Sequence, residues 1–236
     1  MNELIPTGKL RAGIVYAPKM SGLFVLKDGG DGPRGITVDL SRALAEELGV
    51  PVAFTLVPNS GLVTDALASG SIDIAFMPVD DERKKRVDFG PYYCLIESTY
   101  MVTGPSGLKT LADVDQPHVR VVGIANTTTI RASARSLKNT QPVAATSIED
   151  AITMLHAGKA DAYAMGRDAL PDVVKDFPGA CIVDGGFQQT GIAIAVPKGR
   201  PQALAGVTAF MQRAKASGLV RRAMDGAGMQ ALDVAP

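Results

Sequence analysis

The chain has 236 residues, of which 46% are hydrophobic, enough for one large domain or two smaller lobes with cores of their own. The 24 basic and 24 acidic residues cancel, and only 5% of residues are aromatic, so nucleic acid is not an expected partner and a small solute is favoured. No apolar run approaches the roughly eighteen residues that span a bilayer, and MNELIPTGKL lacks the features of a secretion signal, which predicts either a cytosolic chain or one whose leader was removed.

Cysteine and histidine are rare and do not cluster. Cys94 and Cys181 lie far apart in apolar, strand-like stretches, and His118 and His156 are the only histidines. Metal sites need ligands at closer spacing, so we expect neither a metal nor another cofactor. A lone cysteine in such surroundings usually behaves as a small buried hydrophobe, which predicts that both cysteines belong to the core.

The first predicted strand runs from Leu10 to Ala17, where apolar residues alternate until Pro18 ends the run. Tyr16 lies at the end of this strand, so it and the glycine-rich loop 19–35 are placed to cover a ligand. A helix over 37–48 follows, with apolar residues at helical spacing.

A strand over 51–57 and a second, short helix continue the alternation of β and α elements, which is typical of a parallel sheet. We expect Ser60 to cap this helix and Gly70 to end it. Asn59 has two interpretations of equal weight: a cap or turn residue, or an amide that contacts a polar ligand.

The apolar run 72–77 predicts a strand buried on both faces, and a charged turn follows it. Ligands of open α/β sheets bind at the C-terminal ends of the strands, which places Asp80 and Arg83 at a suitable edge. The guanidinium of Arg83 is always charged and offers a planar fork of donors that suits a carboxylate. The alternative is that Arg83 is one more solvated member of a basic run.

The stretch DIAFMPVDDERKKRVDFGPYY, from Asp73 to Tyr93, resembles the signature aD-x-A … T-x-E-R-K-K-x-V-D-F-S-x-P-Y-Y of family 3 solute receptors of ABC importers. The run GITVDLSRALAEELGV resembles a second motif of that family. In the family the arginine of the signature holds the α-carboxylate of the ligand, and the resemblance implies this role for Arg83. The companion threonine of the motif corresponds to Asp80, and the segment before Arg83 is shorter than usual.

After Tyr93, an extended stretch over 96–102 leads to GPSG at 104–107, which we interpret as a linker and lobe boundary. A new strand is predicted over 119–124, and a helix follows from Ile130. The chain therefore begins a second βα pattern here.

The segment NTTT joins this strand to its helix. Hydroxyls and free N–H groups at a helix start favour an anion, although N-capping alone is the competing explanation. The family's V-G-V-x-x-G-T-T segment resembles this stretch and implies that Thr127 and Thr128 bind the same carboxylate as the arginine, with Asn126 where a glycine is commoner.

The predicted strand from Asp161 to Met165 resembles the family motif D-A-x-x-x-D, whose second aspartate binds the α-amino group of the ligand. In this chain that position is Gly166. Either Asp168 takes the ammonium after a shift of the loop, or Arg167 points inward and selects a second anionic group. A third interpretation is that both residues only cap the next helix.

The run FQQTGIAIAV, over 187–196, is predicted to return the chain to the first lobe and resembles the family's Y-G-I-A-V-x-K-G-x-P-x-L run. Gln189 enters this hinge and is a candidate ligand contact. A helix reaching Lys215 and short amphipathic helices from Gly218 complete the chain.

The resemblance implies an α/β fold of the two-lobe, periplasmic-binding-protein-like type II class, in which each lobe has a mainly parallel sheet flanked by helices. Lobe 1 is expected to contain residues 1–97 and 193–236, with both termini, and lobe 2 residues 98–192. Two hinge crossovers would join them.

The implied function is that of a periplasmic receptor which binds a small carboxylate-bearing solute, such as an amino acid, an amino-acid derivative or another organic acid, between two closing lobes. Its implied partners are the permease subunits of an ABC importer, and a monomer is typical of such receptors. No catalysis is expected.

Two alternatives use the same fold. Cyclohexadienyl and arogenate dehydratases expel a leaving group with a carboxylic acid, and Asp168 or Glu149 is the candidate for that acid, although the sequence shows no positioned acid and base pair. The other alternative is a ligand-sensing domain of a larger protein.

Overall fold

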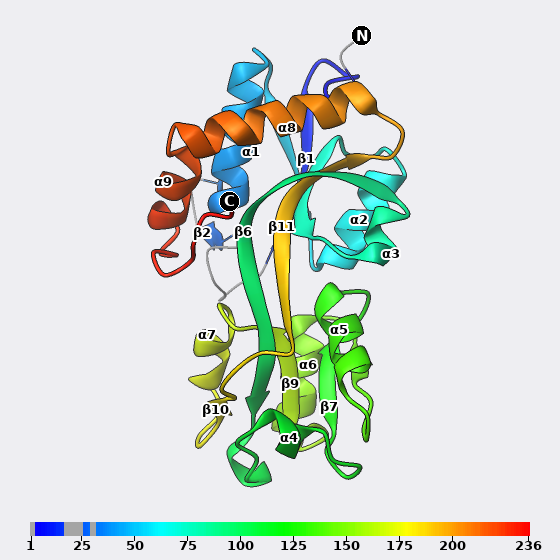
Figure 1. The fold of residues 1–236 in the computed structure, drawn as a ribbon, viewed down its shortest axis with the longest axis vertical. Coiled ribbons are helices and arrows are strands. Elements are labelled where there is room, and N and C mark those ends of the chain that lie inside the picture. Colours follow the sequence, from blue (N-terminus) through cyan, green and yellow to red (C-terminus); the bar gives the residue numbers. More distant parts are fainter. Residues whose placement is uncertain (1–2, 17–25, 29–31) are drawn as a thin grey trace. The chain divides into compact units, whose positions relative to one another are not determined.

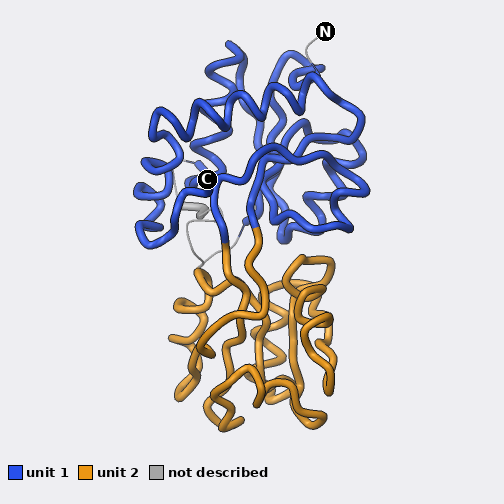
Figure 2. Tube along the Cα trace, viewed as in Figure 1, with its two compact units in different colours: residues 1–95, 191–236 blue, residues 96–190 orange. Residues whose placement is uncertain are grey.

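The computed structural model describes residues 3–16, 26–28 and 32–236 (Figure 1). The chain forms two compact units: unit 1 contains Met1–Leu95 and Gly191–Pro236, and unit 2 contains Ile96–Thr190 (Figure 2). Unit 2 is therefore an insertion in unit 1, which holds both ends of the chain. Most of the loop 19–35 lies outside the described residues, so its expected role in covering a ligand stays a prediction.

Unit 1 contains a sheet with three parallel strands and one antiparallel strand. Its strands are β1 (Leu10–Val15), β4 (Val52–Val57), β5 (Ile74–Pro78) and β11 (Gln188–Pro197). β4 and β5 both pair with β1 in parallel, and β11 pairs with β5 in the opposite direction. A separate hairpin consists of β2 (Leu26–Asp28) and β3 (Gly32–Arg34).

Helices connect these strands because parallel neighbours need long crossovers. The helices of unit 1 are α1 (Ile36–Glu47), α2 (Ser60–Ala68), α3 (Asp81–Lys84), α8 (Pro201–Ala216) and α9 (Leu219–Gly226). α2 packs on β1 and β5, and its buried face forms one core cluster with the sheet. This cluster consists of Val63, Leu67, Ile72, Ala75, Met77, Val87 and Ala195. It fixes where the C-terminal end of β5 lies relative to the start of α2.

Unit 2 repeats the pattern with shorter elements. Its strands are β6 (Val87–Val102), β7 (Val121–Ile124), β8 (Val143–Ala145), β9 (Ala162–Gly166) and β10 (Cys181–Ile182). β8 and β9 flank β7 in parallel, while β6 pairs with β9 and β10 in the antiparallel sense. Its helices are η1 (Gly104–Ser106), α4 (Leu111–Val114), α5 (Thr128–Ser136), α6 (Ile148–His156) and α7 (Leu170–Val174).

β6 and β11 are the two strands that run from one unit into the other. β6 crosses the boundary after Leu95, and β11 crosses it before Gly191 (Figure 2). The GPSG stretch, predicted as a lobe boundary, is instead a short 3-10 turn inside unit 2, because Thr103 and Gly104 accept hydrogen bonds that close it locally.

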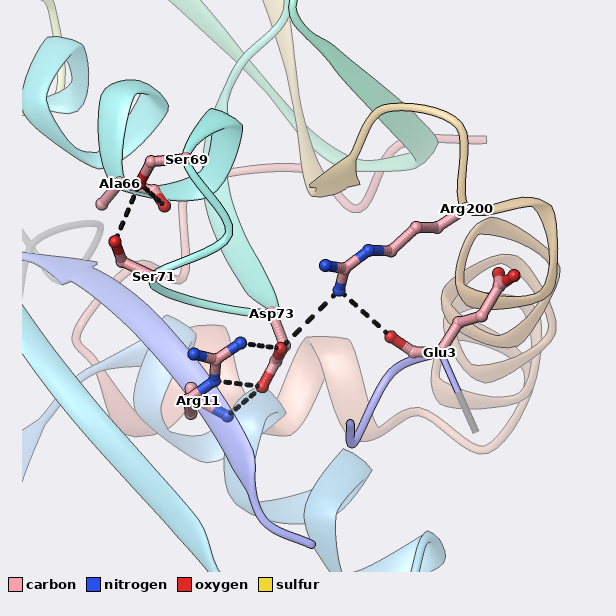
Figure 3. A network of polar contacts seen from close by, with 7 residues as sticks. All are labelled: Glu3, Arg11, Ala66, Ser69, Ser71, Asp73 and Arg200. Carbon is pink, nitrogen blue, oxygen red and sulfur yellow. Dashed lines mark hydrogen bonds and ion pairs between the residues drawn. The ribbon is translucent and has the colours of Figure 1, made fainter. Parts of the chain in front are cut away.

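An arginine and an aspartate tie together the starts of two neighbouring parallel strands in each unit. In unit 1, Nε and Nη2 of Arg11 donate to the carboxylate of Asp73 over 2.9 and 2.6 Å (Figure 3). In unit 2, the same atoms of Arg120 donate to Asp161 over 2.9 and 2.6 Å. In each pair the backbone N–H groups also donate across the pair, from the arginine to the carboxylate and from the aspartate to the arginine's carbonyl. Charge-assisted, bidentate pairs of this kind set strand register as well as adding stability.

The two cysteines differ in burial. Cys94 is buried as predicted, but Cys181 is exposed. The prediction for Cys181 is wrong because β10 is only two residues long, which leaves this side chain outside the core of unit 2.

Candidate functional site

The C-terminal ends of β1, β4 and β5 meet at one edge of the unit 1 sheet, because the three strands are parallel. Tyr16 follows β1, Asn59 follows β4, and Asp80 follows β5. Tyr16 is half-buried, and its N–H donates to the carbonyl of Val57 over 3.0 Å. The structure therefore brings the predicted unit 1 residues to a common edge.

Arg83 lies at this edge with only 3% of its surface exposed. Its Nη1 donates to the carbonyl of Pro78 and its Nη2 to the hydroxyl of Ser60, each over 2.7 Å. Asp80 caps the short helix α3 by accepting from the N–H of Arg83 over 2.8 Å, and this turn directs Arg83 back toward β5. The alternative that Arg83 is a solvated member of a basic run is therefore wrong. Lys84, Lys85 and Arg86 are the exposed members of that run.

Asn59 is the cap of α2, and the expectation that Ser60 plays this part is wrong. The Oδ1 atom of Asn59 accepts from the N–H groups of Gly61 and Leu62 over 2.9 and 3.0 Å. Ser60 is the first helical residue, which leaves its hydroxyl to accept from Arg83. Of the two interpretations of Asn59, the structure supports the cap, and a direct solute contact stays a prediction.

In unit 2, Asn126 is the one non-glycine residue of the described ranges with a positive φ, at 59°. Asparagine tolerates this left-handed conformation better than most residues, which explains why it can stand where the family has glycine. The turn leads directly into α5, whose cap is Thr127. The hydroxyl of Thr127 donates to the carbonyl of Ile124 and accepts from the N–H of Ile130.

The hydroxyl of Thr127 is thus used to cap the start of α5. Thr128 begins α5 and is only 2% exposed. The first N–H groups of any helix have no partner within the helix, and they lie at the positive end of its dipole. The elements that remain for an anion are therefore the N–H groups of Thr128 and Thr129 and the side chain of Thr128.

Gly166 ends β9, and the space beside it is filled by Asp168. A Cβ added at Gly166 would lie 2.7 Å from Oδ1 of Asp168. The carboxylate of Asp168 therefore occupies the place into which a side chain at position 166 would extend. Arg167, between them, points elsewhere: its side chain pairs with Glu97 and donates to the carbonyls of Val183 and Gly185. These contacts give the guanidinium a structural partner, and the role of Arg167 as a selector of a second anion stays a prediction.

Gln189 lies on β11 and is exposed, next to the buried Thr190. Glu149, the other candidate acid, is exposed in the first turn of α6. Two residues that the sequence did not indicate as site residues contact predicted ones: Ser60 contacts Arg83 in unit 1, and Glu97 contacts Arg167 in unit 2. Their contacts join segments 23 and 70 residues apart, so no local pattern could have revealed them.

None of the helices among the described residues is long and apolar enough to cross a membrane. Within the same residues, no group of three or more histidine, cysteine, aspartate and glutamate side chains is arranged to hold a metal ion.

The family model described as bacterial extracellular solute-binding proteins, family 3, matches residues 17–226. A glutamine-binding protein of Geobacillus stearothermophilus is 26% identical over 214 residues, which cover 84% of this chain and 76% of that protein. The membrane-bound lytic murein transglycosylase F of Yersinia enterocolitica is 28% identical over 134 residues, or 56% of this chain. The chain spans only 26% of the length of that transglycosylase.

Solved structures resemble the chain over nearly its whole length. The ancestral amino acid-binding protein AncCDT-1, described as a precursor of cyclohexadienyl dehydratase, matches with a TM-score of 0.80 at 27% identity, covering 95% of this chain and 97% of that one. The amino acid ABC transporter substrate-binding protein AbpA of Streptococcus pneumoniae, bound to L-arginine, matches with a TM-score of 0.81 at 23% identity, covering 96% and 97%. The predicted two-lobe α/β fold of the type II class is confirmed.

Proposed function

Because this chain belongs to the bacterial extracellular solute-binding proteins of family 3, we propose that it is the periplasmic receptor of an ABC importer for a small carboxylate-bearing solute. Amino acids, their derivatives and other organic acids make up this class. Permease subunits are the proposed protein partners, and a monomer is the proposed working state. The described relatives that bind amino acids for ABC transport support this assignment.

The observation that supports the carboxylate most directly is the setting of Arg83. Its guanidinium is held by Ser60 and Pro78 at the C-terminal edge of β5, so its orientation is fixed before a solute arrives. A fixed fork of donors loses little conformational entropy when it binds a carboxylate, and burial strengthens the charge-assisted hydrogen bonds. This is the arrangement that a solute-binding arginine requires.

The start of α5 in unit 2 is the proposed second contact of the same carboxylate. Thr128 and the first N–H groups of α5 offer donors and a partial positive charge. A solute that touches groups of both units favours the closed form only as far as it binds that form better than the open one. The proposed activity is therefore binding coupled to a change between two forms, with no chemical step.

The test is calorimetric titration of the purified chain with amino acids and organic acids, backed by thermal shifts that rise with ligand concentration. Replacing Arg83 with methionine (Arg83→Met) removes hydrogen bonds to a charged group, and we expect roughly a 10- to 100-fold loss of affinity. Arg83→Lys keeps the charge but loses the planar fork of donors, so its affinity should lie between those of the unchanged chain and Arg83→Met. The matched control is Lys85→Met, because Lys85 is exposed and pairs only on the surface with Glu82. An unchanged affinity in a folded Arg83→Met protein would refute the carboxylate role.

A dehydratase is the second candidate, favoured by the description of AncCDT-1 as a precursor of cyclohexadienyl dehydratase. The assay is incubation of the purified chain with prephenate or arogenate and measurement of the aromatic product. Turnover that Asp168→Asn or Glu149→Gln abolishes would overturn the receptor assignment. Binding of solutes without turnover would support it.

A further inference from the structure

The two strands that run between the units are held by different partners on the unit 1 side. β11 enters unit 1 at Gly191, whose carbonyl accepts from the N–H of Val79, just after β5, over 2.9 Å. β6 leaves unit 1 after Leu95, and just before that point it is paired with a segment near the C-terminus. This segment, residues 229–236, is called the strap below.

The strap pairs with β6 one residue before the strand leaves unit 1, and Figure 1 shows it reaching β6 beside the mark C. The N–H of Ala235 donates to the carbonyl of Tyr93 over 2.9 Å, and Val234 forms an antiparallel bridge with Cys94. Tyr93 and Cys94 are fully buried, and Ala235 is only 4% exposed. Water therefore does not compete for this hydrogen bond.

Two cations on neighbouring helices hold the strap in place. Nη1 and Nη2 of Arg221, on α9, donate to the carbonyls of Leu232 and Met229 over 2.7 and 2.9 Å. Nζ of Lys215, on α8, donates to the main-chain oxygen of Pro236 over 2.8 Å. Hydrogen bonds from charged donors are stronger than those between neutral groups. A segment that belongs to no helix is thus fixed at both of its ends.

The pairing with the strap leaves a very short free stretch in β6. Four residues beyond Tyr93, the carbonyl of Glu97 accepts from the N–H of Arg167, a residue of unit 2, over 2.8 Å. Alternate residues of a strand direct their N–H and C=O groups to opposite edges, so Tyr93 and Glu97 use the same edge of β6. Leu95 is the residue between them that faces this edge. It is also the residue after which the chain passes into unit 2.

We propose that the strap is a conformational device that confines the bending of β6 to Leu95 and thereby raises the affinity for the solute. The inference rests on the proposed function, in which the solute favours a closed form. A residue paired in a sheet changes its φ and ψ angles only by breaking hydrogen bonds, whereas an unpaired residue samples many backbone states that closure must then fix. With the strap in place, this ordering is complete before the solute arrives.

The first experiment removes the hydrogen bond between the strap and β6. Ala235→Pro deletes the N–H that donates to Tyr93. We expect faster hydrogen exchange in the peptide that contains residues 93–96. We also expect about a tenfold loss of affinity, because closure must then fix the backbone of an additional residue. Calorimetry measures the affinity for L-glutamine, L-arginine and the tightest binder in a screen of the twenty standard amino acids.

A second variant releases the strap without changing it. Arg221→Met removes the donors to Met229 and Leu232, and it should speed up hydrogen exchange over residues 93–96 and lower the affinity as well. The matched control is Arg222→Met, which removes the same charge from the same helix. Arg222 donates to the carbonyl of Ser217, outside the strap, so this control should change neither quantity.

The second experiment replaces the lost hydrogen bond with a covalent one. Val234→Cys places a thiol opposite Cys94, in an antiparallel pair flanked by the hydrogen bond from Ala235. The Cα atoms of such a pair are about 4.5 Å apart, which a disulfide can span. Cys181→Ser removes the other thiol of the chain.

In this double variant, Ala235→Pro should bind weakly when the disulfide is reduced and regain most of its affinity when the disulfide is oxidised. Oxidation restores the restraint on β6 without restoring the N–H group. Recovery therefore separates a restraint on the hinge from a general loss of packing around Ala235.

The possible outcomes separate this inference from the function on which it rests. Unchanged hydrogen exchange over residues 93–96, or faster exchange with unchanged affinity, would overturn the inference and leave the receptor function standing. An affinity that does not recover on oxidation, or a disulfide that does not form in the folded protein, would do the same. If the unchanged chain binds no carboxylic acid, the proposed function fails, and this inference fails with it.

Discussion

At the scale of single residues, the role of a polar side chain depends on which hydrogen-bond partner the fold places beside it. Asn59 and Ser60 stand side by side in the sequence, and both are good cap residues. The structure uses Asn59 for the cap and gives the hydroxyl of Ser60 to Arg83. The sequence alone could place both residues at the end of β4, but it could not divide these roles between them.

This division predicts different effects for the two residues. Asn59→Ala should lower the free energy of unfolding by about 1 kcal/mol, because the N–H groups of Gly61 and Leu62 lose their acceptor, while Asn59→Asp should retain most of it. Urea denaturation measures both variants. We also compare the loss of solute-binding free energy in Asn59→Ala with its loss in the free energy of unfolding. A larger loss in binding would show that the amide also contacts the solute.

At the scale of elements, most of the fold could be predicted from the sequence. Apolar runs bounded by glycine and proline gave the order and type of the strands, as for β5, which is buried along four of its five residues. The short helix α3 and the turn at Gly166 could not be predicted in the same way. A local cap by Asp80 starts α3, whereas Arg167 in the turn after Gly166 depends on contacts with β6 and the 183–187 segment.

The contact of β6 with β11 gives a second prediction. A Cβ added at Gly191 would lie 2.5 and 2.6 Å from Cδ2 and Cδ1 of Tyr92, so Gly191→Ala forces the ring to move. We expect a loss of about 1–3 kcal/mol in the free energy of unfolding. In a Tyr92→Ala background the same change should cost much less, which a double-mutant cycle in urea would measure.

The control for that cycle is Gly226→Ala. Gly226 ends α9, and beyond its chain neighbours and its own helix backbone no atom lies within 4 Å of an added Cβ, so alanine there should be neutral or slightly stabilising. A Gly191→Ala cost that persists without the Tyr92 ring would show that the backbone of β11, and not this contact, requires glycine.

At the scale of the whole molecule, unit 2 is predicted to be sensitive to acid. A hydrogen bond from Arg120 lowers the pKa of Asp161, and hydrogen bonds from Thr110, Asn139 and Thr146 lower the pKa values of Asp113, Asp115 and Asp150. A carboxyl group with a lowered pKa in the folded state adds stability above its unfolded pKa of about 3.9, and this stability is lost as the pH falls through the folded value. All four aspartates belong to unit 2.

Hydrogen exchange of peptides from unit 2, corrected for the intrinsic rate, tests this prediction. Protection should fall between neutral pH and about pH 3, where these carboxyl groups begin to take up protons. Arg120→Met should reduce the pH dependence, because Asp161 loses the partner that lowers its pKa. Protection that stays constant over this range would contradict the assignment of these carboxylates as stabilising groups.

The return of the chain to unit 1 through β11, late in the sequence, has a consequence for biosynthesis. β5 pairs with β11, and the strand that completes unit 1 leaves the ribosome only after the whole of unit 2. Unit 2 can therefore fold in the nascent chain before β11 is made. Until then the edge of β5 that pairs with β11 stays unpaired and can form wrong strand pairs. We therefore expect a chaperone that shields this edge, or fast translation of the segment from β11 onward, to lower the risk of misfolding.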